Sequence, residues 1–213
     1  VEGDDCIAVV DPHGGPQITA EDYSAMGALI KIEKPTCINE ASFCGNVFAP
    51  QDLINVPDIR ETIVKFGYYA DPNCPSLGEK VKRDLVRAKA MSMLAEYHGC
   101  PILTAMARWI LRAVGAGAVR WSLRGDKTYW DAVVTDGIPD ITKKISEWSQ
   151  HEPGKATREM VERMQGISIA DQLRIENYFN HRQDYGPIPQ LLKFKQEWHD
   201  NYVRLVAPFT LYR

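Results

Sequence analysis

The sequence has little that would place the protein outside the cell or in a membrane. Its five cysteines lie far apart, form no C-x-x-C pair and have no histidine at zinc-finger spacing. We therefore expect neither a disulfide framework nor a structural zinc site. No apolar run approaches the roughly 20 residues that a membrane-spanning helix needs, and no signal-peptide pattern is present. The sequence favours a reducing, cytoplasmic setting.

Net charge is also small, at −3, but it is divided unevenly along the chain. Residues 1–60 contain ten acidic and three basic residues, whereas the remaining residues contain 18 acidic and 22 basic ones. An acidic first part suits metal binding, and a basic second part suits binding of a polyanion such as nucleic acid. Many unrelated proteins share this division, so it restricts the function only weakly.

The pattern of apolar and turn-forming residues changes near residue 70. The first part is rich in strand patterns and contains one short helix, which Thr19 is expected to cap and Gly27 to end. The sequence Gly3-Asp4-Asp5 supplies turn chemistry between two strand-like stretches, which predicts a β-hairpin. The expected strands cover residues 1–10, 28–33, 42–48 and the region around 62–64.

The second part shows the three- and four-residue spacing of amphipathic helices from residue 76 onward. Ser76 and Glu79 predict a capping box for the first helix, and Thr157 and Ser168 are candidate caps for later ones. Helices are expected at residues 77–98, 101–114, 139–149, 156–165, 168–180 and 189–205. We therefore predict an α+β fold, with a β-rich domain at residues 1–70 and a helical domain at residues 71–213.

The adjacent aspartates Asp4 and Asp5 carry the clearest chemical signal in the sequence. At the tip of a hairpin, two neighbouring carboxylates can converge on a hard cation such as Mg²⁺ or Mn²⁺. Nucleotidyl transfer uses two such ions about 4 Å apart, one at the attacking 3′-hydroxyl and one at the triphosphate. An ordinary turn with two solvated acids explains the tripeptide equally well, so the surrounding sequence has to decide.

The surrounding sequence resembles a known family in three consecutive places. Glu2-Gly3-Asp4-Asp5-Cys6, in a hydrophobic hairpin, resembles motif C of positive-strand viral RNA-dependent RNA polymerases. Residues 20–34, a short helix followed by a glycine and a strand ending in lysine, resemble motif D. Residues 41–48 resemble motif E, the primer grip, of nodavirus-like and related polymerases. The motifs occur in the family's order, and the helical remainder has the position of a thumb.

The resemblance implies catalytic roles for four residues. Asp4 matches the main metal ligand of motif C, and Asp5 matches the second aspartate. A motif D lysine is proposed in this family to protonate the leaving pyrophosphate. Lys34 is the better match and Lys31 is the alternative. If residues 28–33 form a strand, the two lysines should point to opposite faces.

The resemblance also implies two regions that contact RNA. The motif E turn, which supports the primer 3′ end, would consist of Phe43, Cys44 and Gly45. Basic residues of the first long helix would contact phosphates of the product RNA, namely Lys80, Arg83 and Arg87. An ordinary solvated helix face explains the same basic residues.

Taken as a whole, the resemblance implies that residues 1–70 form the end of the palm and that residues 71–213 form the thumb. The family's first metal-binding aspartate, its ribose-selecting residues and its fingers precede motif C. They are expected upstream of residue 1, so the chain should not polymerise RNA by itself. The intact enzyme would be an RNA-directed RNA polymerase that uses template RNA and nucleoside triphosphates in viral replication complexes of the host cytoplasm.

Three other interpretations stay open. In the first, the acidic turn is incidental and the helices bind RNA or a protein without catalysis. In the second, the chain is another metal-dependent phosphotransfer enzyme, which needs a further acidic pair such as Asp126 and Asp131. In the third, motif C precedes motif A. The same pair has the motif A spacing, but no Ser-Gly motif follows it.

Overall fold

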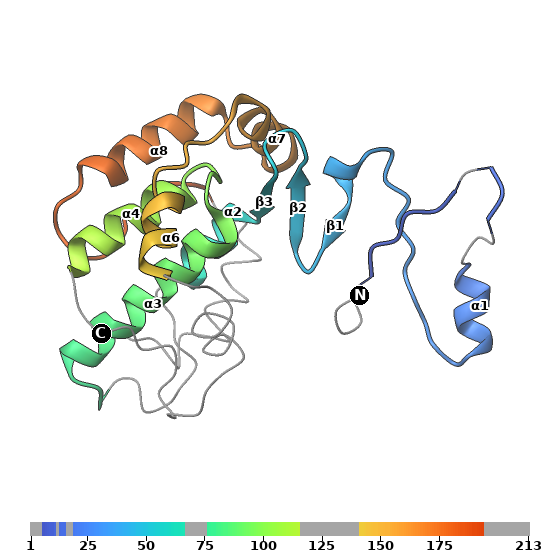
Figure 1. Ribbon diagram of the computed structural model, residues 1–213, viewed down its shortest axis with the longest axis horizontal. Helices are drawn as coiled ribbons and strands as arrows, with labels where there is room; N and C mark the ends of the chain where they lie inside the picture. The colour runs from blue at the N-terminus through green and yellow to red at the C-terminus, as the bar shows by residue number, and fades with distance from the viewer. Residues whose placement is uncertain (1–5, 12, 16–18, 67–75, 116–140, 194–213) are drawn as a thin grey trace.

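A computed structural model describes residues 6–11, 13–15, 19–66, 76–115 and 141–193 (Figure 1). The elements in these ranges are, in order, α1 (Ala20–Ala25), the 3₁₀ turn η1 (Ile38–Glu40), β1 (Ser42–Phe43), β2 (Asn46–Ala49), β3 (Ile54–Pro57), α2 (Ile59–Lys65), α3 (Glu79–Tyr97), α4 (Leu103–Val114), α6 (Ile141–Trp148), α7 (Lys155–Gln165) and α8 (Ile169–His181). The described chain is therefore mixed α+β, with mostly helices and one small antiparallel sheet, as the sequence predicted at that level.

Two regions differ in how they pack. Residues 6–40, which we call the arm, extend away from the helices in Figure 1, and none of their described residues is buried. The described residues from 41 to 193, which we call the body, share one hydrophobic core that runs from Ala49 to Leu192. The predicted domain boundary at residue 70 lies outside the described residues.

The short helix α1 confirms the prediction for residues 19–27. Thr19 caps it: its hydroxyl accepts a hydrogen bond from the Asp22 amide at 3.2 Å, and the Asp22 carboxylate accepts one from the Thr19 amide at 2.9 Å. Gly27 follows the helix with a φ of 82°, a conformation that glycine adopts without steric cost. The helix forms because its two sequence signals, the Thr19 cap and the glycine at position 27, each act on residues a few positions away.

The strand predictions in the arm are wrong for residues 7–10 and 28–33, and residues 1–5, with the predicted hairpin turn, lie outside the described residues. Residues 7–10 and 28–33 form no strand, and their side chains are largely exposed, with Val9 at 99% and Leu29 at 95%. A strand needs a neighbour to satisfy its backbone groups, and no strand among the described residues lies beside either segment. Their alternating pattern is therefore present without the pairing that would make it a sheet.

The other two strand predictions are wrong, one in the number of strands and one in the type of element. Residues 42–48 form two strands, β1 and β2, instead of one strand with a kink. Residues 62–64 lie in helix α2, because Asp58 caps it by accepting from the Glu61 amide at 3.0 Å. Ile59 and Ile63 are four residues apart and both buried, which is the helical spacing that the β-branched run concealed.

The sheet has the order β1-β2-β3, with both pairs antiparallel. The longer pair runs from Asn46 opposite Pro57 to Ala49 opposite Ile54. Ala49, Ile54 and Val56 are buried in the common core, and β3 lies against α3. The sheet is thus attached to the helical body through β2 and β3.

The helices of the body follow the predicted pattern, with differences at their starts. Helix α3 begins at Glu79, and the extended Gly78 is its N-cap, so Ser76 is not the cap as predicted. Thr157 is not a cap either, since α7 begins after Gly154. Ser168 does cap α8, accepting from the Asp171 amide at 3.1 Å.

The central helices pack closely: α4 contacts α3 on one side and α8 on another. Of the helix predicted at residues 189–205, residues 189–193 are not helical and the rest lie outside the described residues. No helix in the described ranges has both the length and the apolar character needed to cross a membrane.

Candidate functional site

The predicted metal ligands Asp4 and Asp5 lie outside the described residues, as do Asp126 and Asp131. Among the residues that the structure describes, no group of three or more histidine, cysteine or acidic side chains is placed to hold a metal ion. The predicted Mg²⁺ or Mn²⁺ site therefore stays a prediction from the sequence.

The candidate proton donors, Lys31 and Lys34, are both exposed and lie in an irregular part of the arm. Their predicted orientation on opposite faces of a strand is wrong, since no strand forms there. The Lys31 ammonium pairs with Glu33, and this hydrogen bond, with the accompanying charge attraction, raises the pKa of Lys31 and lowers that of Glu33. Lys34 has no ion pair with any residue in the described ranges, so it is the less neutralised of the two.

The predicted primer-grip residues are brought together in one turn. Cys44 and Gly45 form the two-residue connection between β1 and β2, and Phe43 pairs with Asn46 on either side of it. Both connecting residues have positive φ, 50° for Cys44 and 75° for Gly45, as a type I′ hairpin turn requires. The Asn46 side-chain amide donates to the Cys44 carbonyl at 3.3 Å. The turn is therefore narrow, and Cys44 and Gly45 are exposed at its tip.

One side chain in the next turn joins this hairpin to the helical body. Asp52, between β2 and β3, accepts hydrogen bonds from the Thr157 amide at 2.9 Å and the Thr157 hydroxyl at 2.6 Å. Thr157 lies in the first turn of α7 and is fully buried. Asp52 therefore acts as the side-chain cap of a helix that begins about 100 residues later. A side chain at the preceding Gly154 would overlap the Asp52 carboxylate.

The other end of α7 is joined to the segment that follows β3. The Gln165 side chain accepts from the Ile59 amide at 3.0 Å and donates to the Pro57 carbonyl at 2.7 Å. Arg60 donates to the Gln165 backbone carbonyl at 2.6 Å. Both ends of α7 thus contact the stretch that continues the hairpin.

A buried ion pair fixes the start of α4. Glu176 binds Arg158 through two hydrogen bonds of 2.9 and 2.8 Å, and it also accepts from the Ile102 amide at 3.0 Å. Ile102 has the rare conformation φ 68°, ψ −50°, and the Leu103 amide donates to the Pro101 carbonyl across it at 2.7 Å. The carboxylate satisfies a backbone donor that this strained turn leaves without a helical partner.

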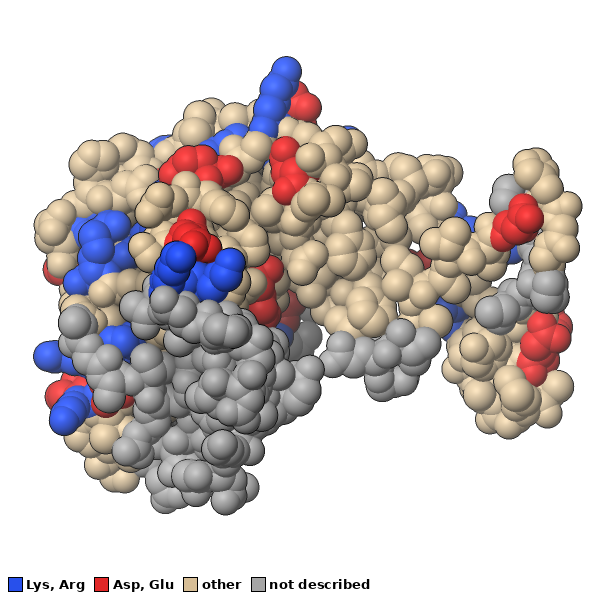
Figure 2. All heavy atoms as spheres, viewed as in Figure 1, with Lys and Arg blue, Asp and Glu red and all other residues tan. Residues whose placement is uncertain are grey.

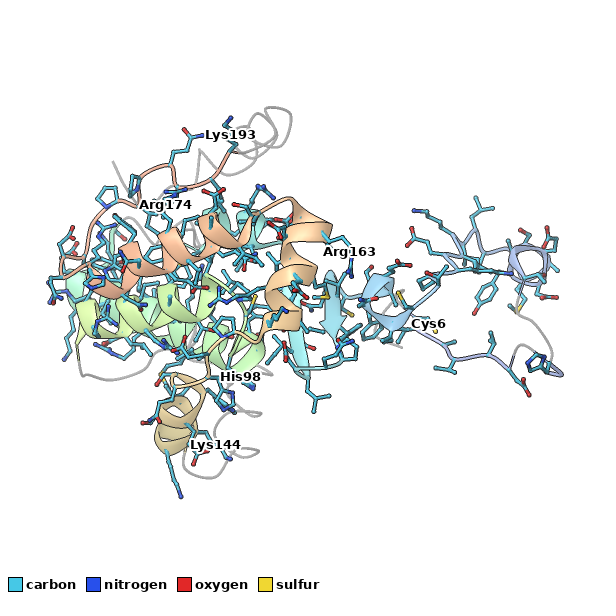
Figure 3. All side chains as sticks on the ribbon, turned by 90° about the horizontal axis from the view of Figure 1, so that it is seen from above. Cys6, His98, Lys144, Arg163, Arg174 and Lys193 are labelled. Carbon is cyan, nitrogen blue, oxygen red and sulfur yellow. The ribbon has the colours of Figure 1, made fainter. Side chains whose placement is uncertain are left out.

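The three basic residues predicted to contact RNA differ in exposure. Lys80 and Arg83 are exposed on α3, whereas Arg87 is buried. Arg87 donates to the Asp84 carboxylate at 2.7 Å and to the Gly115 carbonyl at 3.0 Å, so it joins α3 to the end of α4. Figure 2 shows basic and acidic side chains interspersed on one face of the molecule. Labelled cations such as Lys144 and Lys193 lie on different sides of the body in Figure 3.

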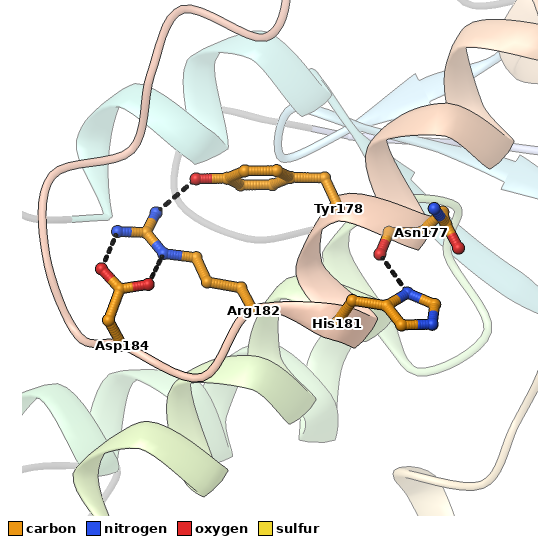
Figure 4. Close-up of a pocket in the computed structure, with 5 residues that line it drawn as sticks. All are labelled: Asn177, Tyr178, His181, Arg182 and Asp184. Atoms are coloured by element: carbon orange, nitrogen blue, oxygen red, sulfur yellow. Dashed lines mark hydrogen bonds and ion pairs between the residues drawn. The ribbon is translucent and has the colours of Figure 1, made fainter.

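A shallow pocket of about 360 Å³ lies at the end of α8 (Figure 4). Its lining residues are Asn177, Tyr178, His181, Arg182 and Asp184. The Arg182 guanidinium lies 4.6 Å from the ring centre of Trp109 and binds Asp184 through two hydrogen bonds of 2.9 Å. The hydrogen bond to Arg182 lowers the pKa of Asp184. Because these charges neutralise each other, we assign the pocket a structural role in closing the end of α8.

Comparison with protein-family models, curated proteins and solved structures found no match to this chain. The function therefore has to be argued from the order of the motifs and the geometry described above. The turn at residues 43–45 was found by resemblance, whereas Asp52, Gln165 and Glu176 were not. Each of these three acts on a residue more than 70 positions away, and no local sequence signal marks such a contact.

Proposed function

We propose that this chain is the C-terminal palm and thumb of a viral RNA-dependent RNA polymerase, which adds nucleotides to an RNA 3′ end under the direction of a template. The observation that carries the proposal is the order of three motifs: Gly3-Asp4-Asp5, then a helix and lysines, then the turn at residues 43–45. Helix α1 and the narrow β1–β2 hairpin support it, since motifs D and E call for these two elements. The helical body that follows has the place of a thumb.

In this proposal Asp4 and Asp5 would hold Mg²⁺ or Mn²⁺, because adjacent carboxylates offer the oxygen ligands that such ions prefer. The metal ions would lower the barrier to attack of the 3′-hydroxyl on the α-phosphate and stabilise the charge on the leaving pyrophosphate. Lys34, or Lys31 as the alternative, would donate a proton to that pyrophosphate. The turn formed by Cys44 and Gly45 would support the end of the growing RNA.

The exposure of the arm favours the same proposal. Its strand-like segments at residues 7–10 and 28–33 carry largely exposed apolar side chains, among them Val9 and Leu29. In an intact palm, strands that precede motif C would pair with such segments and cover them. The proposal thus explains why two segments with a strand pattern form no strand in the structure.

The proposal is tested by expressing the polypeptide encoded by the full reading frame that contains this chain and measuring Mg²⁺-dependent RNA synthesis. Asp4→Ala should reduce synthesis to background. Asp11→Ala, which removes an exposed carboxylate that accepts a hydrogen bond from the nearby His13 amide, is the matched control and should retain synthesis. If Asp4→Ala synthesises RNA as well as wild type, the proposal is wrong.

A second candidate is a non-catalytic helical module that binds RNA or a protein. The exposed Lys80 and Arg83 on α3 favour it, because basic side chains on one helix can contact phosphates. It predicts that replacing both residues with alanine weakens RNA binding and lowers its salt dependence. It also predicts that Asp4→Ala changes nothing.

A further inference from the structure

Helix α7 contacts the hairpin-bearing segment at both of its ends. At its first turn, Asp52 binds Thr157, and at its last turn, Gln165 binds the residues on either side of Asp58. Thr157 and Gln165 are eight positions apart in this helix (165 − 157), which is about 12 Å of rigid helix. The β2–β3 pair is therefore fixed at two points against one straight element.

We infer that Asp52 is a positioning residue for the β1–β2 turn, and that α7 sets through it where the RNA 3′ end lies. This inference rests on the proposed function, in which Cys44 and Gly45 support that end. Strand β2 runs directly from Asn46, beside the turn, to Ala49, three residues before Asp52. Four strand residues span about 13 Å, so a shift at Asp52 is carried to the turn along a hydrogen-bonded strand.

The contact has features that separate it from an ordinary helix cap. Its acceptor is a carboxylate from a distant turn, and its partner Thr157 is completely buried, so the contact holds two surfaces together. Gly154 leaves the space that the carboxylate occupies. The negative charge also faces the positive end of the α7 dipole. Ser168, by comparison, caps α8 through hydrogen bonds with Asp171, which lies three residues later in the same helix.

The experiment compares three variants of the intact polypeptide. Asp52→Ala removes the contact, Asp52→Asn keeps a side-chain oxygen that can accept from Thr157, and Ser168→Ala removes a cap from α8 alone. For each, we would measure KM for a primed RNA, KM for nucleoside triphosphate, and the melting temperature. Asp52→Ala should raise KM for primed RNA by on the order of tenfold to a hundredfold and leave the nucleotide KM unchanged, because misplacing the 3′ end affects only RNA positioning.

Asp52→Asn should recover most of the loss, and Ser168→Ala should lower the melting temperature without changing KM for primed RNA. An unchanged KM in Asp52→Ala, or an equal change in Asp52→Ala and Ser168→Ala, would overturn the inference, since the contact would then act only on stability.

A second measurement separates this inference from the proposed function. Hydrogen exchange of the 213-residue chain needs no RNA synthesis. Asp52→Ala should speed exchange in β2 and the first turn of α7, and Ser168→Ala should speed it only in α8. If wild-type polypeptide makes no RNA but exchange changes in this way, the proposed function fails and the mechanical link from α7 to the hairpin stands. If Asp52→Ala leaves β2 exchange unchanged, the link itself is absent.

Discussion

The arm and the body contain the same kinds of apolar residue but bury them to very different extents. Leu94 in the body is fully buried, whereas Leu29 in the arm is 95% exposed. The difference follows from the elements that each region contains. Helices satisfy their backbone groups within one segment, so each helix of the body needs neighbours only to cover its apolar face. The strand-like segments of the arm depend on a neighbour, and the described chain supplies none.

Helix α1 supports this explanation from within the arm. It is as exposed as the segments on either side, yet it forms, because Thr19 and Asp22 satisfy its first amides locally. Burial is therefore not what separates formed from unformed elements in the arm. In the arm, the element that forms is the one whose hydrogen bonds join residues close together in the sequence.

The largest effect that we expect from a single substitution is in the body, at Glu176. Glu176→Ala would leave the partly buried Arg158 without its partner and the buried Ile102 amide without an acceptor, so the free energy of unfolding should fall by about 3 kcal/mol. Urea denaturation measures this. The arm offers the matched pair, Lys31 with Glu33, and Glu33→Ala should produce no measurable change because that pair is exposed. Equal losses of unfolding free energy in Glu176→Ala and Glu33→Ala would contradict the difference in packing between the arm and the body.

Truncating equivalent leucines tests the same comparison for apolar contacts. Leu94→Ala should lower the free energy of unfolding by about 2–5 kcal/mol, since it removes a fully buried side chain and leaves a cavity. Leu29→Ala should leave the unfolding midpoint in urea unchanged. A loss at Leu29 comparable to that at Leu94 would mean that the arm is packed in solution.

Two glycines at helix starts give a smaller and sharper test within the body. Gly154 and Gly78 precede α7 and α3 with similar extended backbones, but only Gly154 lies against another side chain. Gly154→Ala should displace Asp52 and lower the free energy of unfolding by about 1–2 kcal/mol, the usual value of a helix cap. Gly78→Ala should lower it by less than about 1 kcal/mol, the difference between glycine and alanine at an N-cap, because it displaces no other side chain. Similar melting temperatures for the two variants would contradict the assigned role of Asp52.

The smallest expected effect is a pH dependence at His98. Burial lowers the pKa of His98 below its ordinary value of 6.5, and its ring stacks on Trp148. The unfolded chain therefore takes up a proton at a pH where the folded chain does not. The contribution of neutral His98 to stability is complete above pH 6.5 and declines as the pH falls below it. His98→Gln should flatten the slope of unfolding free energy against pH in this range, and an unchanged slope would exclude His98 as its source.

Much of the body could be predicted from the sequence because its signals are local. The spacing of apolar residues and the Ser168 cap both act within a few residues, and the structure confirms them. Predictions were wrong where a distant partner decides the outcome. The strands of the arm lack such a partner, and the start of α7 is set by Asp52 instead of Thr157.

The candidate site shows the same division. The turn at Cys44 and Gly45 could be recognised from the residues around it, and the structure brings Phe43, Cys44 and Gly45 together. The burial of Arg87 could not be foreseen, because its partners include the Gly115 carbonyl, 28 residues away. The sequence alone does not show whether a basic residue on a helix contacts solvent, phosphate or a neighbouring helix.

Hydrogen exchange of the arm, measured in this chain alone and within the intact polypeptide, tests the account most directly. In the chain alone, residues 6–11 and 29–34 should exchange at nearly intrinsic rates, while the amides of α4 are strongly protected. In the intact polypeptide, the same arm segments should become protected, because palm strands would pair with them. Exchange that stays fast in both would contradict the claim that the arm completes a polymerase palm.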